Sequence, residues 1–235
     1  MDQEFDELYV HFWRDELLGA RLTREVRLII HLAGLRPGDR VLDLGAGFGR
    51  IAAGLAEQGL DVVAVERSGV LAEVAKRLVG STCQLIVGDW NRVALGSGFA
   101  CVLFWFTTLV AGRTADLGSL HRAKAALAQD GFLLVETRHW DRMNREFEEY
   151  TERHSTLGVL SEEHRYDPIT GVQTTRERYQ LKERQLQRSY SIRRYGFPEL
   201  RCMALDAGFR DVDGFDERGE PLDAVSHRAV LRARA

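Results

Sequence analysis

The chain has 235 residues, a length typical of one large α/β domain that needs no disulfide or metal to stabilise its core. It carries 32 Lys plus Arg against 35 Asp plus Glu, and a net charge of −3 gives no strong field to attract nucleic acid or an anionic membrane. Cys83, Cys101 and Cys202 lack the spacing of a metal site or a disulfide framework. We therefore expect one domain that acts on a small molecule, with no metal, nucleic acid or membrane partner.

The N-terminal part predicts a helical cap over residues 1–35. Its start is acidic without an apolar signal core, and the longest apolar run, around residues 99–112, is too short to cross a bilayer. These two features predict a cytoplasmic protein. Apolar residues then recur at helical spacing over residues 5–33, with a break near Gly19 and a stop at Gly34, so two helices are expected.

Residues 36–138 alternate between strand and helix patterns. Short apolar runs are found at residues 40–44, 61–65, 83–87, 99–106 and 132–136, and helical patterns separate most of them, at 51–58, 69–79 and 115–128. This order needs right-handed crossovers and buries both faces of the sheet. It predicts an α/β fold with a doubly wound, Rossmann-like and mostly parallel sheet that carries the cofactor site.

Residues 139–196 interrupt this pattern. After a helical segment near 140–150, alternating runs at 158–164, 172–181 and 186–195 predict antiparallel strands that form a lid over the carboxyl edge of the sheet. Residues 197–235 return to the core with a helix at 198–207 and strands at 209–215 and 226–234. The expected sheet has seven strands, of which the last is antiparallel.

The first strand ends in a glycine-rich turn, Asp43-Leu44-Gly45-Ala46-Gly47-Phe48-Gly49. Glycines directly after a buried strand let the chain turn sharply and let a ligand approach the backbone. The dinucleotide fingerprint GxGxxG is not matched, because Arg50 stands where its third glycine would be. The phosphate loop GxxxxGK is absent as well, so the turn indicates neither NAD nor a nucleoside triphosphate.

An acidic residue followed by GxGxG makes the chain resemble the class I S-adenosylmethionine-dependent methyltransferases, most closely the small-molecule enzymes with an antiparallel lid. The resemblance implies S-adenosylmethionine as cofactor and S-adenosylhomocysteine as product. Asp43 and the glycines would hold the amino-acid end, Glu66 the ribose, and Asp89 with Trp90 the adenine, while Tyr9 would close over the cofactor. The cofactor-binding residues expected on this basis are Tyr9, Asp43, Gly45, Ala46, Gly47, Gly49, Arg50, Glu66, Arg67, Gly88, Asp89, Trp90 and Phe104.

The acceptor site is expected in a pocket under the lid, between Trp105, His139 and the lid strands. The aromatic run at residues 104–106 suggests an apolar pocket, although strand alternation directs at least one of these rings into the core. Positioning supplies most of the rate, since a sulfonium is already activated, and His139 is the candidate general base. The acceptor-binding residues expected are Trp13, Trp105, Phe106, His139, Tyr166, Arg193 and Tyr195.

Several alternatives stay open at this stage. Residues 176–201 hold eight basic residues against three acidic ones, which leaves a peptide or RNA acceptor as one alternative. A non-catalytic S-adenosylmethionine-binding or sensor domain is another. The sequence does not decide whether nitrogen, oxygen or carbon is methylated, or whether the protein is a monomer or a homodimer.

Overall fold

The structure is a computed structural model that describes residues 3–106 and 108–235. Its larger sheet has seven strands, which are β1 (Arg40–Leu44), β2 (Asp61–Glu66), β3 (Cys83–Val87), β4 (Phe99–Phe104), β5 (Leu127–Arg138), β10 (Arg210–Phe215) and β11 (Arg228–Arg234). Their order in the sheet is β10-β11-β5-β4-β1-β2-β3, and only the pairs that include β11 are antiparallel. The predicted seven-stranded, Rossmann-like sheet with an antiparallel last strand is therefore confirmed.

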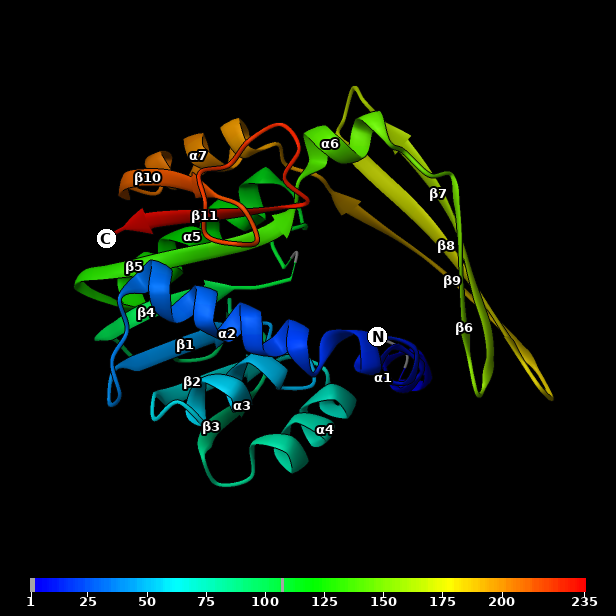
Figure 1. Ribbon diagram of the computed structural model, residues 1–235, viewed down its shortest axis with the longest axis horizontal. Helices are drawn as coiled ribbons and strands as arrows, with labels where there is room; N and C mark the ends of the chain where they lie inside the picture. The colour runs from blue at the N-terminus through cyan, green and yellow to red at the C-terminus, as the bar shows by residue number, and fades with distance from the viewer. Residues whose placement is uncertain (1–2, 107) are drawn as a thin grey trace.

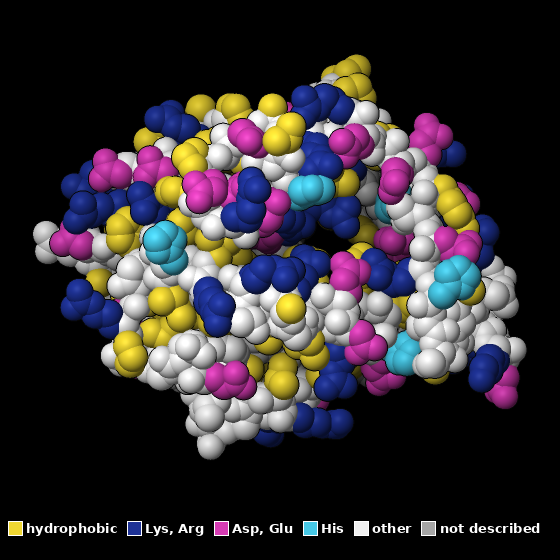
Figure 2. All heavy atoms as spheres, viewed as in Figure 1, with side chains coloured by type: hydrophobic (Ala, Val, Ile, Leu, Met, Phe, Trp, Pro, Cys, Tyr) yellow, Lys and Arg dark blue, Asp and Glu magenta, His cyan; other side chains and the backbone are white. Residues whose placement is uncertain are grey.

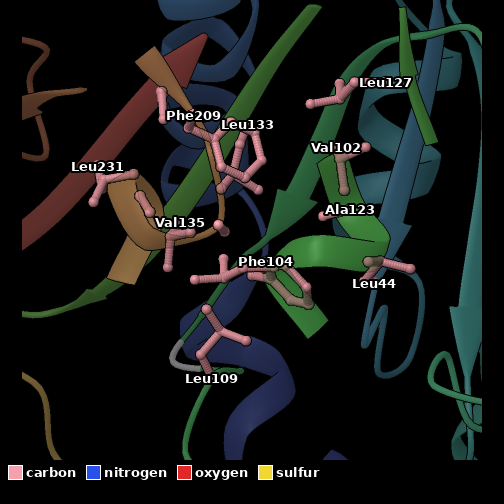
Figure 3. Close-up of a cluster of buried hydrophobic side chains, with 14 of the residues drawn as sticks. Leu44, Val102, Phe104, Leu109, Ala123, Leu127, Leu133, Val135, Phe209 and Leu231 are labelled. Carbon is pink, nitrogen blue, oxygen red and sulfur yellow. The ribbon is translucent and has the colours of Figure 1, made fainter. Parts of the chain in front are cut away.

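Helices cover both faces of this sheet (Figure 1). The helices are α1 (Gln3–Leu17), α2 (Ala20–Ala33), α3 (Arg50–Ala56), α4 (Gly69–Val79), α5 (Arg113–Ala126), α6 (Trp140–Arg145) and α7 (Phe197–Asp206). Side chains of α2 and α3 pack with one face of β1, β2 and β4, and side chains of α5 and α7 pack with the other. Figure 3 shows the second of these clusters, which includes Phe104, Leu133 and Leu231 from the sheet and Ala123 from α5. Among the described residues, no helix combines the length and the hydrophobicity that a membrane crossing requires.

The lid is a separate antiparallel sheet of four strands, β6 (Tyr150–Ser155), β7 (Gly158–Asp167), β8 (Val172–Leu181) and β9 (Gln185–Arg193), in that order. The sequence predicted three of them. The expectation of a helix near residues 140–150 was wrong in its second half, because α6 ends at Arg145 and β6 begins at Tyr150. The side chains of β6 are all polar apart from the Tyr150 ring, so this strand lacks the apolar alternation that identifies a half-buried strand.

Helix α1 connects the core and the lid. Phe5, Leu8 and Phe12 pack against Leu160 of β7 and Tyr179 of β8 in a small hydrophobic cluster. In Figure 1, α1 accordingly lies between the core sheet and the lid sheet. This packing encloses a space whose floor is the carboxyl edge of the parallel strands, where ligands of open α/β sheets bind.

Candidate functional site

The glycine turn after β1 uses its glycines for two different purposes. Gly45 and Gly47 both have positive φ, at 81° and 59°. A Cβ on Gly45 would lie 2.6 Å from Thr108 Cγ2, so this position requires glycine for packing. A Cβ on Gly47 would meet no heavy atom within 4 Å, so the missing side chain leaves open space for a ligand.

Glu66, at the end of β2, lies against this turn. Its carboxylate accepts hydrogen bonds from the backbone N–H of Gly47 at 2.8 Å and of Ser68 at 2.7 Å. Burial raises the pKa of Glu66, and the backbone donors oppose that shift. The carboxylate is thus fixed in position at the edge of a cavity, where it can accept further hydrogen bonds from a ligand's hydroxyl groups.

The largest of the cavities beside the turn has a volume of about 580 Å³. That size is within the range of small-molecule and cofactor sites. Trp90 is fixed in its wall because its Nε1 donates to Ser119 Oγ at 3.0 Å. Six of the expected cofactor residues line this cavity: Tyr9, Gly45, Glu66, Arg67, Asp89 and Trp90. The lining also includes polar residues that were not expected, among them Asp6, Asn91, Thr108, Asp116 and Ser119.

A smaller cavity of about 140 Å³ lies on the other side of the turn, lined in part by Tyr9, Asp43, Ala46, Arg50 and Trp105. Asp43 Oδ2 and Arg50 Nη2 are buried there and have no hydrogen-bond partner among the described residues. Burial raises the pKa of Asp43 to about 7, while the charge of Arg50 acts to lower it. A carboxylate oxygen and a guanidinium nitrogen left unpaired fit an ammonium and a carboxylate, the two charged groups of an amino acid. The residues present therefore fit the amino-acid end of S-adenosylmethionine.

Phe104 corrects the expected set of cofactor contacts. Its ring is fully buried in the core and contacts the Trp90 ring edge-on at 6.0 Å between centroids. Phe104 lies behind the cavity wall and lines none of the cavities described here.

Two further expected residues, Gly88 and Gly49, are required for packing. A Cβ on Gly88 would lie 2.5 Å from Val93 Cγ1. Similarly, a Cβ on Gly49 would lie 2.9 Å from Ala75 of α4.

A third cavity, of about 450 Å³, lies beneath the lid; we call it the lid cavity. Tyr9 lines it and also lines both cavities at the glycine turn. Figure 2 shows the hollow between the core and the lid, with basic and acidic side chains around it. The residues that line the lid cavity are Tyr9, Trp13, Phe106, Arg138, Trp140, Glu148, Thr151, Arg153, Glu162, His164, Gln173, Glu177, Arg188, Tyr190, Ile192 and Arg228.

The apolar acceptor pocket expected from residues 104–106 is not found. Phe104 and Trp105 are buried, and of the three rings only Phe106, which has a φ of 66°, reaches the lid cavity. Trp105 lines the small cavity at the turn. Arginine and glutamate side chains supply much of the lid cavity wall instead, because the lid strands direct polar residues inward. Trp13 lines this cavity, and its contact with an acceptor stays a prediction.

His139 is misplaced for the predicted role of general base. Its side chain is buried and lines none of the cavities described here. Its Nδ1 lies 3.0 Å from the backbone oxygen of Ser226, and its Nε2 lies 3.7 Å from Asp141 Oδ2. His139 therefore fastens the loop before β11 to the start of α6, and the prediction of a catalytic role was wrong.

The three lid residues expected to contact the acceptor anchor the lid instead. Tyr195 is buried and donates from its hydroxyl to Asp116 Oδ2 at 2.7 Å. Arg193 forms an ion pair with Glu199 at 2.9 Å. Tyr166 lies against the buried guanidinium of Arg194, 4.8 Å from the ring centroid. The contacts of Tyr195 and Arg193 tie the end of the lid to α5 and α7, and none of the three predicted residues lines the lid cavity.

The comparisons with known proteins agree with this geometry. Residues 41–131 match a family model described as a methyltransferase domain. A protein-L-isoaspartate O-methyltransferase of Methylorubrum extorquens is 51% identical over 67 residues, which are 27% of this chain and 29% of that protein. A ribosomal RNA small subunit methyltransferase A of Anaeromyxobacter dehalogenans is 38% identical over 81 residues, 34% of this chain and 28% of that protein. The chain thus matches less than a third of the length of these curated relatives.

Solved structures resemble the whole chain. The CcbJ methyltransferase from Streptomyces caelestis has a TM-score of 0.79 at 24% identity and covers 91% of this chain and 94% of its own. CalS10, an amino pentose methyltransferase from Micromonospora echinaspora, has a TM-score of 0.72 at 17% identity, with 100% and 97% covered. The sugar N-methyltransferase KedS8 from Streptoalloteichus has a TM-score of 0.73 at 16% identity, with 98% and 93% covered.

The CalS10 structure contains bound S-adenosylmethionine, the cofactor that the sequence predicts here. The match over residues 41–131 and the shared fold agree with the family and the cofactor that the sequence predicts. The chain therefore contains a methyltransferase domain and has the fold of the class I S-adenosylmethionine-dependent methyltransferases.

Proposed function

We propose that this protein transfers a methyl group from S-adenosylmethionine to a small-molecule acceptor held in the lid cavity. The observation that carries the proposal is the position of Tyr9, whose side chain lines both cavities at the glycine turn and the lid cavity. A donor at the turn and an acceptor under the lid would meet at this side chain. Burial raises the pKa of Tyr9 to about 12, so it remains a neutral hydrogen-bond donor at this junction.

The chain's own residues would bind and orient both partners. Asp43 and Arg50 would hold the amino-acid end of the cofactor and Glu66 its ribose, while Asp89 and Trp90 would face its adenine. The bound cofactor supplies an activated methyl group, so alignment and exclusion of water account for most of the rate enhancement. Helix α1 and the lid would exclude water from the space between donor and acceptor.

A small acceptor is favoured over RNA or a peptide. The curated relatives named for RNA or protein methylation match only 27% and 34% of this chain. The solved structures similar over the whole chain include enzymes named for an amino pentose and for a sugar nitrogen. A lid cavity of about 450 Å³ is also within the range of small-molecule sites.

The binding step is tested with two glycine variants. Gly47 and Gly34 both have positive φ, near 60°, and open space around the missing Cβ, so Gly47→Val and Gly34→Val introduce similar backbone strain. We expect Gly47→Val to weaken S-adenosylmethionine binding in calorimetry by at least about tenfold, because its side chain would occupy the ligand's space. Gly34→Val should bind like the wild type. Equal affinity of both variants would refute the assignment of the turn.

The transfer step is tested with radiolabelled S-adenosylmethionine and a panel of amines, phenols and indoles. The proposal predicts that label moves to at least one small acceptor and that Gly47→Val abolishes the transfer. If the protein binds the donor but labels no small acceptor, it is a sensor domain. If it labels only RNA or a peptide, the acceptor assignment is wrong.

A further inference from the structure

Glu162 is placed where an acceptor would lie. It belongs to β7, on the face that carries Leu160 and His164, and this face is directed toward α1 and the lid cavity. Its neighbour Glu163 is on the opposite, exposed face, near Arg176 and Arg178. The carboxylate of Glu162 thus faces the lid cavity. Tyr9 lines this cavity and also lines the cavities at the glycine turn.

Most charges that line the lid cavity are paired with one another or with neighbours. Arg188 forms an ion pair with Glu177, Arg153 with Glu16, and Arg228 with Glu136. Among the described residues, no Lys or Arg nitrogen lies within 4.0 Å of the Glu162 carboxylate. Within the part of the chain that the structure describes, Glu162, Glu148 and Arg138 are the charged lining groups without an ion pair. The unpaired charge of the cavity is therefore negative when both carboxyl groups are ionised.

A directional chain of hydrogen bonds ends at Glu162. Arg194, which can only donate, binds Gln173 Oε1, and this contact directs the amide nitrogen of Gln173 to His164 Nδ1 at 3.1 Å. His164 Nδ1 is therefore the acceptor nitrogen, and the proton of the neutral ring is on Nε2, 3.2 Å from Thr151 Oγ1. The Thr151 hydroxyl accepts this proton's hydrogen bond and donates its own to Glu162 Oε2 at 3.2 Å.

The lid keeps this carboxylate at an energetic cost. Glu162 pairs directly with Glu177 in the antiparallel register of β7 and β8, and like charges in that position destabilise a sheet. Burial raises the pKa of Glu162, and the charge of Glu177 raises it further, while Thr151, Arg138 and Arg153 oppose the shift. A half-buried carboxyl group with a raised pKa, a donor directed at one oxygen and a cavity beside it is a typical arrangement for binding and deprotonating a ligand.

We infer that Glu162 binds the ammonium group of the acceptor and removes its proton, which makes the acceptor of this protein a basic amine. The inference rests on the proposed function, because it assigns the acceptor of that same site. In the step it describes, the N–H bond of the ammonium breaks and its proton passes to a Glu162 oxygen. The freed nitrogen lone pair forms a bond to the methyl carbon, and the electrons of the carbon–sulfur bond return to sulfur, which becomes a neutral thioether. The methylated nitrogen carries the positive charge, and Glu162 releases its proton to solvent.

The hydrogen-bond chain makes Thr151 and His164 positioning residues. They fix one oxygen of Glu162, which leaves the other oxygen available to the acceptor. The two matched variants Glu162→Gln and Glu163→Gln each remove one negative charge from adjacent positions of β7, and only the first faces the cavity.

The probes are matched pairs of amines and alcohols, namely benzylamine with benzyl alcohol, tryptamine with tryptophol, and glucosamine with glucose. Their binding to the protein saturated with S-adenosylhomocysteine is measured by calorimetry and ligand-observed NMR, so that the readout does not depend on turnover. We expect the wild type to bind at least one amine about tenfold or more tightly than its alcohol. Glu162→Gln should lose that preference, and Glu163→Gln should keep it.

Two results would overturn the inference. One is a wild type that binds no amine more tightly than its alcohol. This outcome is measured on the wild type alone, so it does not depend on whether a variant folds. The other is a Glu162→Gln variant that keeps the preference. Calorimetry with S-adenosylmethionine on the same samples distinguishes this failure from failure of the proposed function. A wild type that does not bind the donor contradicts both proposals. A wild type that binds the donor but shows no amine preference contradicts only the role of Glu162.

Discussion

Asp43 and Arg50 are buried polar groups that the fold leaves partly unpaired. An unsatisfied buried donor or acceptor costs about 1–3 kcal/mol, so such atoms need a compensating role. Asp43 Oδ2 and Arg50 Nη2 lie at one small cavity, and the Arg50 guanidinium is held from its other side by Glu25. A zwitterionic ligand would satisfy both atoms at once, so their cost is best understood as preparation of a binding site.

The raised pKa of Asp43 predicts that cofactor binding releases protons. With a pKa of about 7, this carboxyl group is about half protonated at pH 7. A bound ammonium would favour the ionised form, so binding at pH 7 should release about half a proton, and less at higher pH. Calorimetry in phosphate and in Tris, which differ in ionisation enthalpy, measures this number.

Asp43→Asn is the control for that experiment. Since an asparagine cannot titrate, the variant should bind S-adenosylmethionine with an enthalpy that is the same in both buffers. A variant that still releases protons would assign the release to another group, with Glu66, whose pKa is also raised, as the alternative.

At the scale of single residues, the sequence was informative where a residue type has one physical reason to be present. The glycines of the turn and the carboxylates at the ends of β1 and β2 lie together as expected, because strand ends at one sheet edge must lie together. Phe104 and His139 were assigned wrongly because closeness in sequence to that edge does not determine where a side chain points. The Phe104 ring turns into the core, and the His139 ring faces the loop before β11.

At the scale of elements, the sequence predicted three of the four lid strands and missed β6, so it gave the lid but not its full extent. Strand β8 has Gln173, Thr175, Glu177 and Tyr179 on its buried face, so its alternation is between two polar sets. The sequence therefore predicted the strand but could not tell which face lines a cavity. Glu162 and His164 of β7 were missed for the same reason. The sequence feature that could have suggested them is the recurrence of titratable side chains at every second position of this strand.

The contact between Tyr195 and Asp116 predicts how firmly the lid is attached to the core. The phenol donates to a buried carboxylate at 2.7 Å, and a hydrogen bond to a charged group contributes about 1.5–3 kcal/mol. Tyr195→Phe should lower the free energy of unfolding by an amount in this range, measured by urea denaturation.

Tyr150→Phe provides the matched control for the attachment of the lid. The Tyr150 hydroxyl also donates to a carboxylate, Glu152, at 2.7 Å, but its side chain is exposed on β6. Its loss should change the free energy of unfolding by less than about 0.5 kcal/mol. If both variants had the same stability as the wild type, Tyr195 would not be an anchor and its assignment to acceptor binding would need to be tested again.

At the scale of the whole molecule, the site is assembled from three segments that are far apart in sequence. Tyr9 comes from α1, the glycine turn from the core and Glu162 from the lid. The sequence predicted each segment but not their junction, because the packing of Phe5 and Phe12 of α1 on the lid is a tertiary contact that neither helical periodicity nor strand alternation encodes.

This shared packing predicts that cofactor binding is felt in the lid. A ligand at the glycine turn would contact Tyr9 and reduce local opening of α1, and the cluster of Phe12 with Leu160 and Tyr179 would extend that effect to β7 and β8. Hydrogen exchange followed by mass spectrometry should therefore slow in residues 3–17, 43–50 and 158–181 together when S-adenosylhomocysteine is added. Helix α7 and β10, which line none of the cavities described here, should exchange at an unchanged rate.

Phe12→Leu tests whether the coupling passes through α1. The smaller side chain loses the edge contact of the Phe12 ring with Tyr179, whose centroids are 5.6 Å apart, while the residues at the glycine turn are unchanged. Protection of residues 43–50 should persist in this variant and protection of 158–181 should fall. Phe209→Leu, which changes the core cluster away from the lid, should leave both unchanged. Lid protection that persisted in Phe12→Leu would mean that the ligand acts on the lid directly, without α1 between them.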